Sequence, residues 1–337
     1  MGMFTLDKLP KKVLEKLDLQ TVFMVSRVVV AAERLQVFRK LSGRQLTAAQ
    51  LGRMLRIHRQ KRELFLGSLV AIGLLKKKGN LYFNSPLAEK YFVRERPIYW
   101  TRLYSENCVT EYERFPVLEK MLATGKNYAS IVGKKSIGYL DVIARNRTWA
   151  SEFTHMLYYH HLPEAQALAK KLDLRGYHTL LDVGGGSGVM SIALAKKYPQ
   201  LKACVLDMKT VTPVTRKIVR REGLSKRIST TVGDLNRDLP TGYDVIMFCD
   251  VDIADYRRTF KTAYERLPVG GLVVVVEELA SEDFTEPLTR IMWQLRSEPF
   301  WLKTRREMAD ILKACGFKSV KGSFLCRDSW LITGRKT

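Results

Sequence analysis

The sequence predicts a two-part protein, in which a mainly helical winged-helix domain precedes an α/β domain built on a Rossmann-like, doubly wound sheet. Three observations support this prediction. Apolar residues recur with helical spacing between residues 19 and 93, strand and helix patterns alternate from residue 179 onward, and a glycine-rich turn follows the first of those strands. Strands that alternate with helices of this length build a mostly parallel sheet.

The first 93 residues contain the elements of a winged helix-turn-helix. Apolar residues at i, i+3, i+4 and i+7 predict amphipathic helices over residues 22–41, 46–55 and 58–73. The turn signal Lys78-Gly79-Asn80 lies between two short runs and predicts a β-hairpin, which a last helix follows.

Helical patterns interleaved with aromatic residues continue beyond this region. We expect them to form a connector whose aromatic side chains pack a domain interface. The expected domains are therefore a winged helix over residues 1–95, a helical connector over 96–165 and an α/β domain over 166–337.

The α/β domain is predicted element by element from residue 179. Strands are expected in the segments TLLDV, KACVLD, ISTTVGD, YDVIMFCD and LVVVVEE, helices over residues 189–197, 211–221, 256–267 and 305–315, and a closing hairpin in KSVKG and SWLITG.

The chain of 337 residues carries a formal net charge of +23, of which +15 lies in residues 1–160 and +8 in residues 161–337. Such a charge attracts polyanions or acidic small molecules, although a basic surface also serves solubility alone. The charge therefore allows an anionic substrate without demanding one.

Composition and the remaining sequence features narrow the class of protein. No apolar run approaches the roughly 20 residues that cross a bilayer, and the first residues lack a signal-peptide pattern, so we expect a cytoplasmic protein. Five scattered cysteines without a CxxC pair argue against a disulfide framework and against a zinc site, and no metal is expected.

The segment LLDVGGGSG carries the first chemical motif. It puts Asp182 at the end of a strand and Gly184, Gly186 and Gly188 in the turn that opens the next helix, where a backbone must approach a ligand closely. A dinucleotide fingerprint needs glycine or alanine where this chain has Val189. The spacing therefore favours S-adenosylmethionine over NAD as the cofactor.

Acidic residues end the next two strands. Asp207, followed by Met208, is suited to accept hydrogen bonds from both ribose hydroxyls, and Asp234 with Leu235 is suited to the adenine amino group and ring. Taken singly, Asp207 also suits a helix N-cap and Asp234 a turn. Taken in this order, they strengthen the prediction of the cofactor.

These motifs lie in a chain that resembles the small-molecule O-methyltransferases of the plant caffeate, bacterial phenazine and animal hydroxyindole type, which are class I S-adenosylmethionine-dependent enzymes. The resemblance covers nearly the whole chain and is carried by AAERLQVFRKL, LTAAQLGRML, the core LDLRGYHTLLDVGGGSGVMSIALAKKYP and the strand LPVGGLVVVVEE. It implies a homodimer formed through the winged helix and connector, and a substrate bound between connector and catalytic domain. It also implies that the cofactor is lined by Asp182, Gly184, Gly186, Asp207, Asp234, Leu235 and Cys249.

The chain departs from this family where catalysis is expected. The family has a Leu-His-Asp-Trp stretch whose His removes a phenol proton, whereas this chain reads MFCDVDIADYRRTF and places Asp252 there. A carboxylate with a pKa of about 3.9 is a poor base for a phenol near 10 unless burial raises that pKa. Three explanations are open: Asp252 is a burial-tuned base, the base is His155, His160 or His161, or the acceptor needs no base.

The acceptor pocket is expected between two aromatic and methionine-rich segments. Met156, Tyr159 and His160 share one helical face, and Met292 and Trp293 are expected opposite them. Such residues suit a planar ring, and each is equally suited to plain core packing.

The predicted function is transfer of a methyl group to a hydroxyl of a small planar aromatic or heteroaromatic acceptor. Two alternatives stay open: a C-methyltransferase or related enzyme of this family without a general base, and a winged-helix regulator with a vestigial cofactor domain. The basic helix GRMLRIHRQKREL is the feature that a DNA-binding regulator would use. In the resembling family this helix packs in the dimer, and nucleic acid is not expected as a partner.

Overall fold

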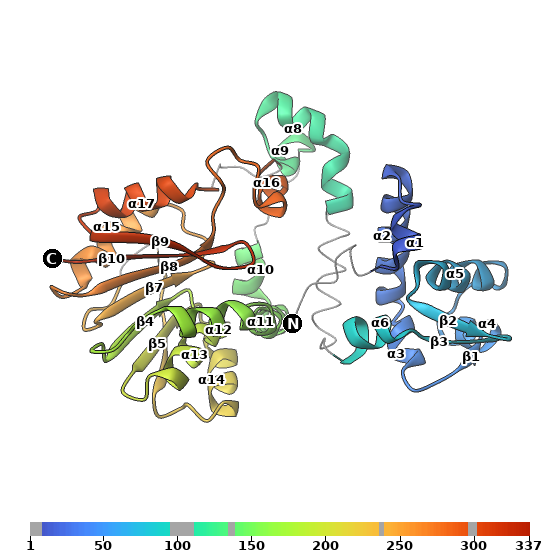
Figure 1. The fold of residues 1–337 in the computed structure, drawn as a ribbon, viewed down its shortest axis with the longest axis horizontal. Coiled ribbons are helices and arrows are strands. Elements are labelled where there is room, and N and C mark those ends of the chain that lie inside the picture. Colours follow the sequence, from blue (N-terminus) through green and yellow to red (C-terminus); the bar gives the residue numbers. More distant parts are fainter. Residues whose placement is uncertain (1–8, 95–110, 134–138, 236–238, 296–301) are drawn as a thin grey trace. The chain divides into compact units, whose positions relative to one another are not determined.

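The computed structural model describes residues 9–94, 111–133, 139–235, 239–295 and 302–337 (Figure 1). It divides into two compact units, Met1–Glu113 and Arg114–Thr337. Much of the expected connector lies in the second unit, and residues 95–110 are outside the described residues.

The first unit combines helices with a small antiparallel sheet of strand order β1-β3-β2. Its elements are α1 (Lys11–Leu14), α2 (Leu19–Arg34), α3 (Val37–Leu41), β1 (Leu46–Thr47), α4 (Ala48–Met54), α5 (Arg59–Ile72), β2 (Leu75–Lys78), β3 (Leu81–Asn84), α6 (Pro86–Ala88) and the π-helical η2 (Glu89–Arg94). The expected hairpin is present as β2 and β3, and α4, α5 and this hairpin follow one another as in a winged helix.

Two local features of this unit differ from the expected helices. Gln36 adopts a left-handed backbone with φ of 60°, so the first expected helix is divided into α2 and α3. Leu46 and Thr47 pair with β3 as β1, and Thr47 then begins α4 through a capping box with Gln50. Pairing with a distant strand outweighs helical spacing at these two positions.

The second unit is built on a seven-stranded sheet of order β6-β5-β4-β7-β8-β10-β9, in which β6 to β8 are parallel and β10 is antiparallel to both its neighbours. Its strands are β4 (Thr179–Val183), β5 (Lys202–Asp207), β6 (Ile228–Val232), β7 (Val245–Cys249), β8 (Leu272–Glu278), β9 (Lys318–Cys326) and β10 (Ser329–Arg335). Its helices are η3 (Phe115–Val117), α8 (Leu118–Thr124), α9 (Tyr128–Ile131), α10 (Tyr139–Arg145), α11 (Arg147–His160), α12 (Leu162–Lys171), α13 (Val189–Lys197), α14 (Thr212–Arg221), α15 (Tyr256–Arg266), α16 (Leu288–Leu295) and α17 (Arg305–Ala314).

The central strands alternate between two cores. In β7, Val245 and Met247 join the core under α12, α13 and α14, whereas Ile246 and Phe248 join the core under α15 and α17. Helices therefore cover both faces of the sheet (Figure 1). The doubly wound α/β prediction is confirmed, with every expected strand and helix of this unit present.

Helix α11 contacts α14 and is tied to the core by a polar contact. The Tyr158 hydroxyl donates to Glu222 Oε1 at 2.9 Å, and Glu222 also pairs with Lys196 of α13 at 2.7 Å. The Asn146 side chain caps the start of α11. These contacts hold α11 beside the carboxyl end of β5, where Trp149 and Phe153 pack with Met208. Within the described residues, no helix has the length and apolar character that a bilayer span requires.

Candidate functional site

The site lies at the carboxyl ends of the parallel strands, where the strand order reverses between β4 and β7. In doubly wound folds a ligand binds at this switch point. The glycine-rich turn between β4 and α13 occupies it, and Gly184, Gly186 and Gly188 have φ values of 66°, 53° and 73°.

The three glycines serve different purposes. A Cβ on Gly184 would lie 2.8 Å from Val251, and one on Gly188 would lie 3.2 Å from Thr215, so both positions are closely packed. A Cβ on Gly186 would meet only the Gly184 carbonyl oxygen, at 3.9 Å. Gly186 therefore leaves open space above the turn, as a bound ligand would need.

Asp182 lies fully buried beneath this turn. Ser191 Oγ donates to its Oδ2 at 2.6 Å, whereas Oδ1 is buried without a hydrogen-bond partner among the described residues. Burial raises the pKa of Asp182 to about 6. An unpaired buried acceptor beside an open glycine turn fits a ligand that carries donor groups.

Asp207 ends β5 on the other side of the turn. Its Oδ2 accepts from the Gly186 N–H at 2.8 Å and its Oδ1 from the Met208 N–H at 2.7 Å. Burial raises the pKa of Asp207, and these two hydrogen bonds oppose the shift. Each oxygen keeps capacity for a second donor, so the carboxylate can still accept from a pair of ribose hydroxyls.

The end of β6 lies next to Asp207. The Gly233 N–H donates to the Asp207 carbonyl oxygen at 3.2 Å, which brings Asp234 to the same edge of the sheet. Asp234 is exposed, and Leu235 is half-buried against the core under α15 and α17. Together the turn, Asp182, Asp207 and this edge form a cradle that fits S-adenosylmethionine, with the individual contacts remaining predictions.

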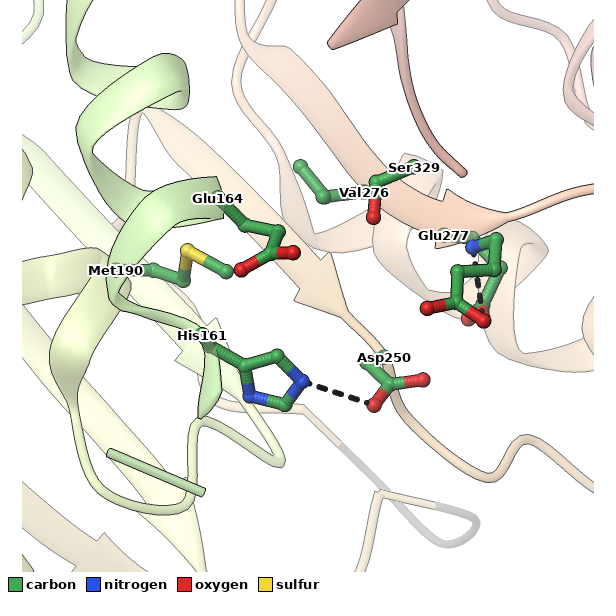
Figure 2. A pocket seen from close by; sticks show the side chains of 8 residues that line it. His161, Glu164, Met190, Asp250, Val276, Glu277 and Ser329 are labelled. Carbon is green, nitrogen blue, oxygen red and sulfur yellow. Dashed lines mark hydrogen bonds and ion pairs between the residues drawn. The ribbon is translucent and has the colours of Figure 1, made fainter. Parts of the chain in front are cut away.

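A second group of charged residues gathers after β7 (Figure 2). His161, at the junction of α11 and α12, places its Nε2 3.1 Å from Asp250 Oδ2. Arg290 of α16 donates to Asp250 Oδ1 at 2.6 Å and also pairs with Glu278. Asp250 itself has a left-handed backbone with φ of 46°, which aspartate tolerates better than most residues.

Burial and neighbouring charges shift the pKa values here in opposite directions. Burial alone would raise the pKa of Asp250, but Arg290 and His161 outweigh it and hold that pKa below its ordinary value. Burial, followed by the charge of Asp250, raises the pKa of Glu277 well above its usual range. Burial also raises the pKa of the Cys249 thiol, which lies near Asp182 and Glu277. Asp250 is therefore ionised at neutral pH, whereas burial favours the protonated forms of Glu277 and Cys249.

These groups border a small pocket that is partly open to solvent. Its lining residues come from α12, α13, β8, β10 and the segments that follow α11 and β7, and they are His161, Glu164, Met190, Asp250, Val276, Glu277, Glu278 and Ser329. Among the described residues, no group of three or more His, Cys, Asp or Glu is arranged to hold a metal ion.

The structure separates the four residues that the sequence offered as bases. His155 lies on α11, where its Nδ1 is 2.8 Å from the Ser151 carbonyl oxygen. Asp252 is exposed, so the burial that would tune it is not found, and that explanation is corrected. Burial and the neighbouring His161 lower the pKa of His160 to about 3, which makes its imidazole a weak proton acceptor. Of these four, only His161 lines the pocket.

The residues predicted to contact the acceptor lie outside this pocket in the described structure. Met156 is half-buried on α11, Tyr159 packs against the core under α12 to α14, and Met292 and Trp293 are 39% and 38% exposed on α16. Their contact with an acceptor stays a prediction.

Sequence reasoning missed Asp250, the partner of His161, and the charged residues around it. Asp250 directly follows β7, and Glu277 and Glu278 end β8, so the positions of all three at the carboxyl edge of the sheet could have indicated them. No sequence pattern indicated Arg290, because its place beside Asp250 depends on how α16 packs.

Comparison with known proteins points to the same cofactor as the geometry of the cradle. The chain is 26% identical over 282 residues to 3-hydroxy-5-methyl-1-naphthoate 3-O-methyltransferase of Streptomyces sahachiroi, covering 80% of this chain and 79% of the relative. It is 37% identical over 128 residues to L-tyrosine C(3)-methyltransferase of Streptomyces lavendulae, a match that covers only 36% and 35% of the two chains. The structure of human N-acetylserotonin methyltransferase in complex with SAM superposes with a TM-score of 0.80 at 22% identity, over 100% of this chain and 99% of that one.

The family model of the O-methyltransferase domain matches residues 115–318. This match confirms the expected family, enzyme class and cofactor, and neither the base-free alternative nor the regulator is favoured. The chain belongs to the O-methyltransferase domain family and is an S-adenosylmethionine-dependent methyltransferase.

Proposed function

We propose that this enzyme methylates a hydroxyl group on a small planar aromatic acceptor and that His161 is its general base. The single observation that carries the base assignment is the contact between His161 Nε2 and Asp250 Oδ2 beside the pocket. The family and the naphthoate O-methyltransferase support a phenolic acceptor.

The proton on His161 follows from the state of Asp250. Because Asp250 is ionised and already accepts from Arg290, its Oδ2 can only accept from His161. The imidazole Nε2 therefore carries the hydrogen, and Nδ1 of the neutral ring keeps a lone pair for an incoming proton. Asp250 holds this tautomer and stabilises the imidazolium that forms, as the carboxylate of a catalytic triad does.

The residues of the site have different roles in the proposed reaction. S-adenosylmethionine, when bound in the cradle, supplies a sulfonium methyl group. The acceptor oxygen would take this methyl group as the carbon–sulfur bond breaks and S-adenosylhomocysteine leaves. The hydroxyl proton would pass to His161 Nδ1, so no proton is left on the product ether. Met190 and Val276 supply apolar surface in the pocket, and exclusion of water with correct alignment can contribute several kcal/mol.

The test combines product analysis with two matched variants. The protein is incubated with S-adenosylmethionine and a panel of planar phenols, and each product is placed by mass spectrometry and NMR. We expect O-methylation, and a fall of about 10²- to 10⁴-fold in kcat for His161→Gln with loss of the base-dependent limb of the pH profile. The control Asp252→Asn should retain activity, because Asp252 is exposed. Methylation only at carbon or nitrogen, or an active His161→Gln, would contradict the proposal.

We also propose that two chains associate through the first unit. Support comes from α2, where Leu19, Phe23 and Met24 are 95%, 55% and 48% exposed. Apolar side chains exposed in this number on one helix are typical of an interface. A dimeric mass by light scattering at micromolar concentration is expected, and Phe23→Glu should shift it towards the monomer. A monomeric wild-type protein would overturn the proposal.

A further inference from the structure

The pocket beside His161 is acidic, although the chain as a whole is strongly basic. We infer that Glu164 binds a positively charged amino group carried by the aromatic acceptor. This inference rests on the proposed function, because it places the acceptor in this pocket. It differs from the expectation of an anionic acceptor, which was based on the net charge alone.

One carboxylate oxygen of Glu164 accepts a hydrogen bond, and the other is buried without a donor among the described residues. The residue is 4% exposed in the first turn of α12, and its Oε1 accepts from Arg327 NH1 at 3.0 Å. Its Oε2 is buried and has no hydrogen-bond partner in the part of the chain that the structure describes. Figure 2 shows the carboxylate turned towards the space between Met190, His161 and Val276. A buried charged acceptor without a donor is costly, so a donor from the ligand would stabilise it.

The other carboxyl groups of the pocket are already matched. Asp250 accepts from His161 and Arg290, and Glu278 pairs with Arg290. Glu277 Oε1 accepts from the Glu278 N–H at 3.2 Å, and burial raises the pKa of Glu277. The unmet acceptor is therefore specific to Glu164.

The charge balance agrees with a single bound cation. The carboxyl groups of Glu164, Asp250 and Glu278 pair with two guanidinium groups, those of Arg290 and Arg327, so acidic side chains outnumber basic ones in these ion pairs. An ammonium group is a compact cation with three donors and suits such a position, whereas a carboxylate would be repelled. The pocket is small, so it suits a compact group at the end of a larger molecule rather than a whole ring system.

The inference is tested by binding to protein saturated with S-adenosylhomocysteine, using phenols matched in ring and different in charge. The amine arm is tyramine, dopamine and serotonin. The neutral arm is 4-ethylphenol, 4-ethylcatechol and 3-ethyl-5-hydroxyindole, and the acid arm is the three corresponding hydroxyaryl acetates. We expect at least one amine to bind at least tenfold more tightly than its neutral counterpart and the acids to bind most weakly. Equal binding across the arms, preference for the acids, or no binding of any amine would overturn the inference.

Two variants localise the effect. Glu164→Gln should remove the preference for the amine while leaving the affinity for the neutral phenol unchanged. Arg327→Gln removes the same ion pair but leaves the carboxylate, so it should keep the preference or increase it. Loss of the preference in both variants would mean that the ion pair only supports the fold. Because binding is measured without methyl transfer, an amine that binds but is not methylated on oxygen contradicts the proposed function alone.

Discussion

His161 Nε2 lies 3.1 Å from Asp250 Oδ2, although 89 positions separate the two residues in the chain. The contact joins the end of α11 to the end of β7 and orients the imidazole beside the pocket. Under the assignment proposed above, His161 takes the place of the histidine that the resemblance leads us to expect after this strand.

Asp250→Asn should lower kcat by about 10²-fold or more, with a small effect on cofactor affinity. The amide has nearly the same size, but it no longer fixes the tautomer or stabilises the imidazolium. Steady-state kinetics with a phenolic acceptor and calorimetry with S-adenosylhomocysteine measure the two effects separately. Equal losses in kcat and in affinity for S-adenosylhomocysteine would show that Asp250 acts in the cofactor site instead.

Asp207→Ala should weaken binding of S-adenosylhomocysteine by roughly 1.5–3 kcal/mol, as expected for lost charge-assisted hydrogen bonds. The matched variant Asp234→Ala should lose less affinity for S-adenosylhomocysteine, because Asp234 is exposed and water competes for its hydrogen bonds. Calorimetry on both variants gives the comparison. Unchanged affinity in Asp207→Ala would remove the ribose assignment.

Alanine at two glycines of the turn should separate folding from binding. Gly184→Ala meets Val251 at 2.8 Å and should lower the free energy of unfolding by roughly 1–3 kcal/mol. Gly186→Ala has space for the methyl group and should cost only the strain of its backbone, about 1–2 kcal/mol, while the methyl group obstructs the cofactor. Denaturation and calorimetry test this contrast, and a Gly186→Ala protein of full affinity would contradict it.

Asp182→Asn should change how stability of the cofactor-free protein depends on pH. The pKa of Asp182 is about 6 in the folded protein and 3.8 ordinarily. The stability that protonated Asp182 contributes is therefore fully present below about pH 3.8 and is lost as pH rises through 6. The loss amounts to at most about 3 kcal/mol at neutral pH. Urea denaturation of both proteins at pH 4.5 and pH 7 measures their free energies of unfolding. The free energy of unfolding of the variant relative to that of wild type should be higher at pH 7 than at pH 4.5. No change in the difference between the two pH values would mean that Asp182 titrates as an exposed carboxylate.

The sequence alone determined the features that depend on neighbouring residues. Alternating strands and helices, the glycine turn and Asp207 at the end of β5 were all predicted, because residue spacing and strand ends follow local rules. The same local rules missed β1 and the break at Gln36, where pairing and packing outweigh helical spacing.

Only the tertiary structure decided which charged residues form the site. Asp252 and Asp250 are two positions apart, yet one is exposed, whereas the other meets His161 and Arg290. That choice depends on the left-handed turn at Asp250 and on the packing of α11 and α16 around the end of β7. Arg290 is 40 positions from Asp250 along the chain, and no periodicity links residues so far apart. Long-range packing sets such contacts, and with them the surroundings of His161, the charge of the pocket and the burial of the Glu164 carboxylate.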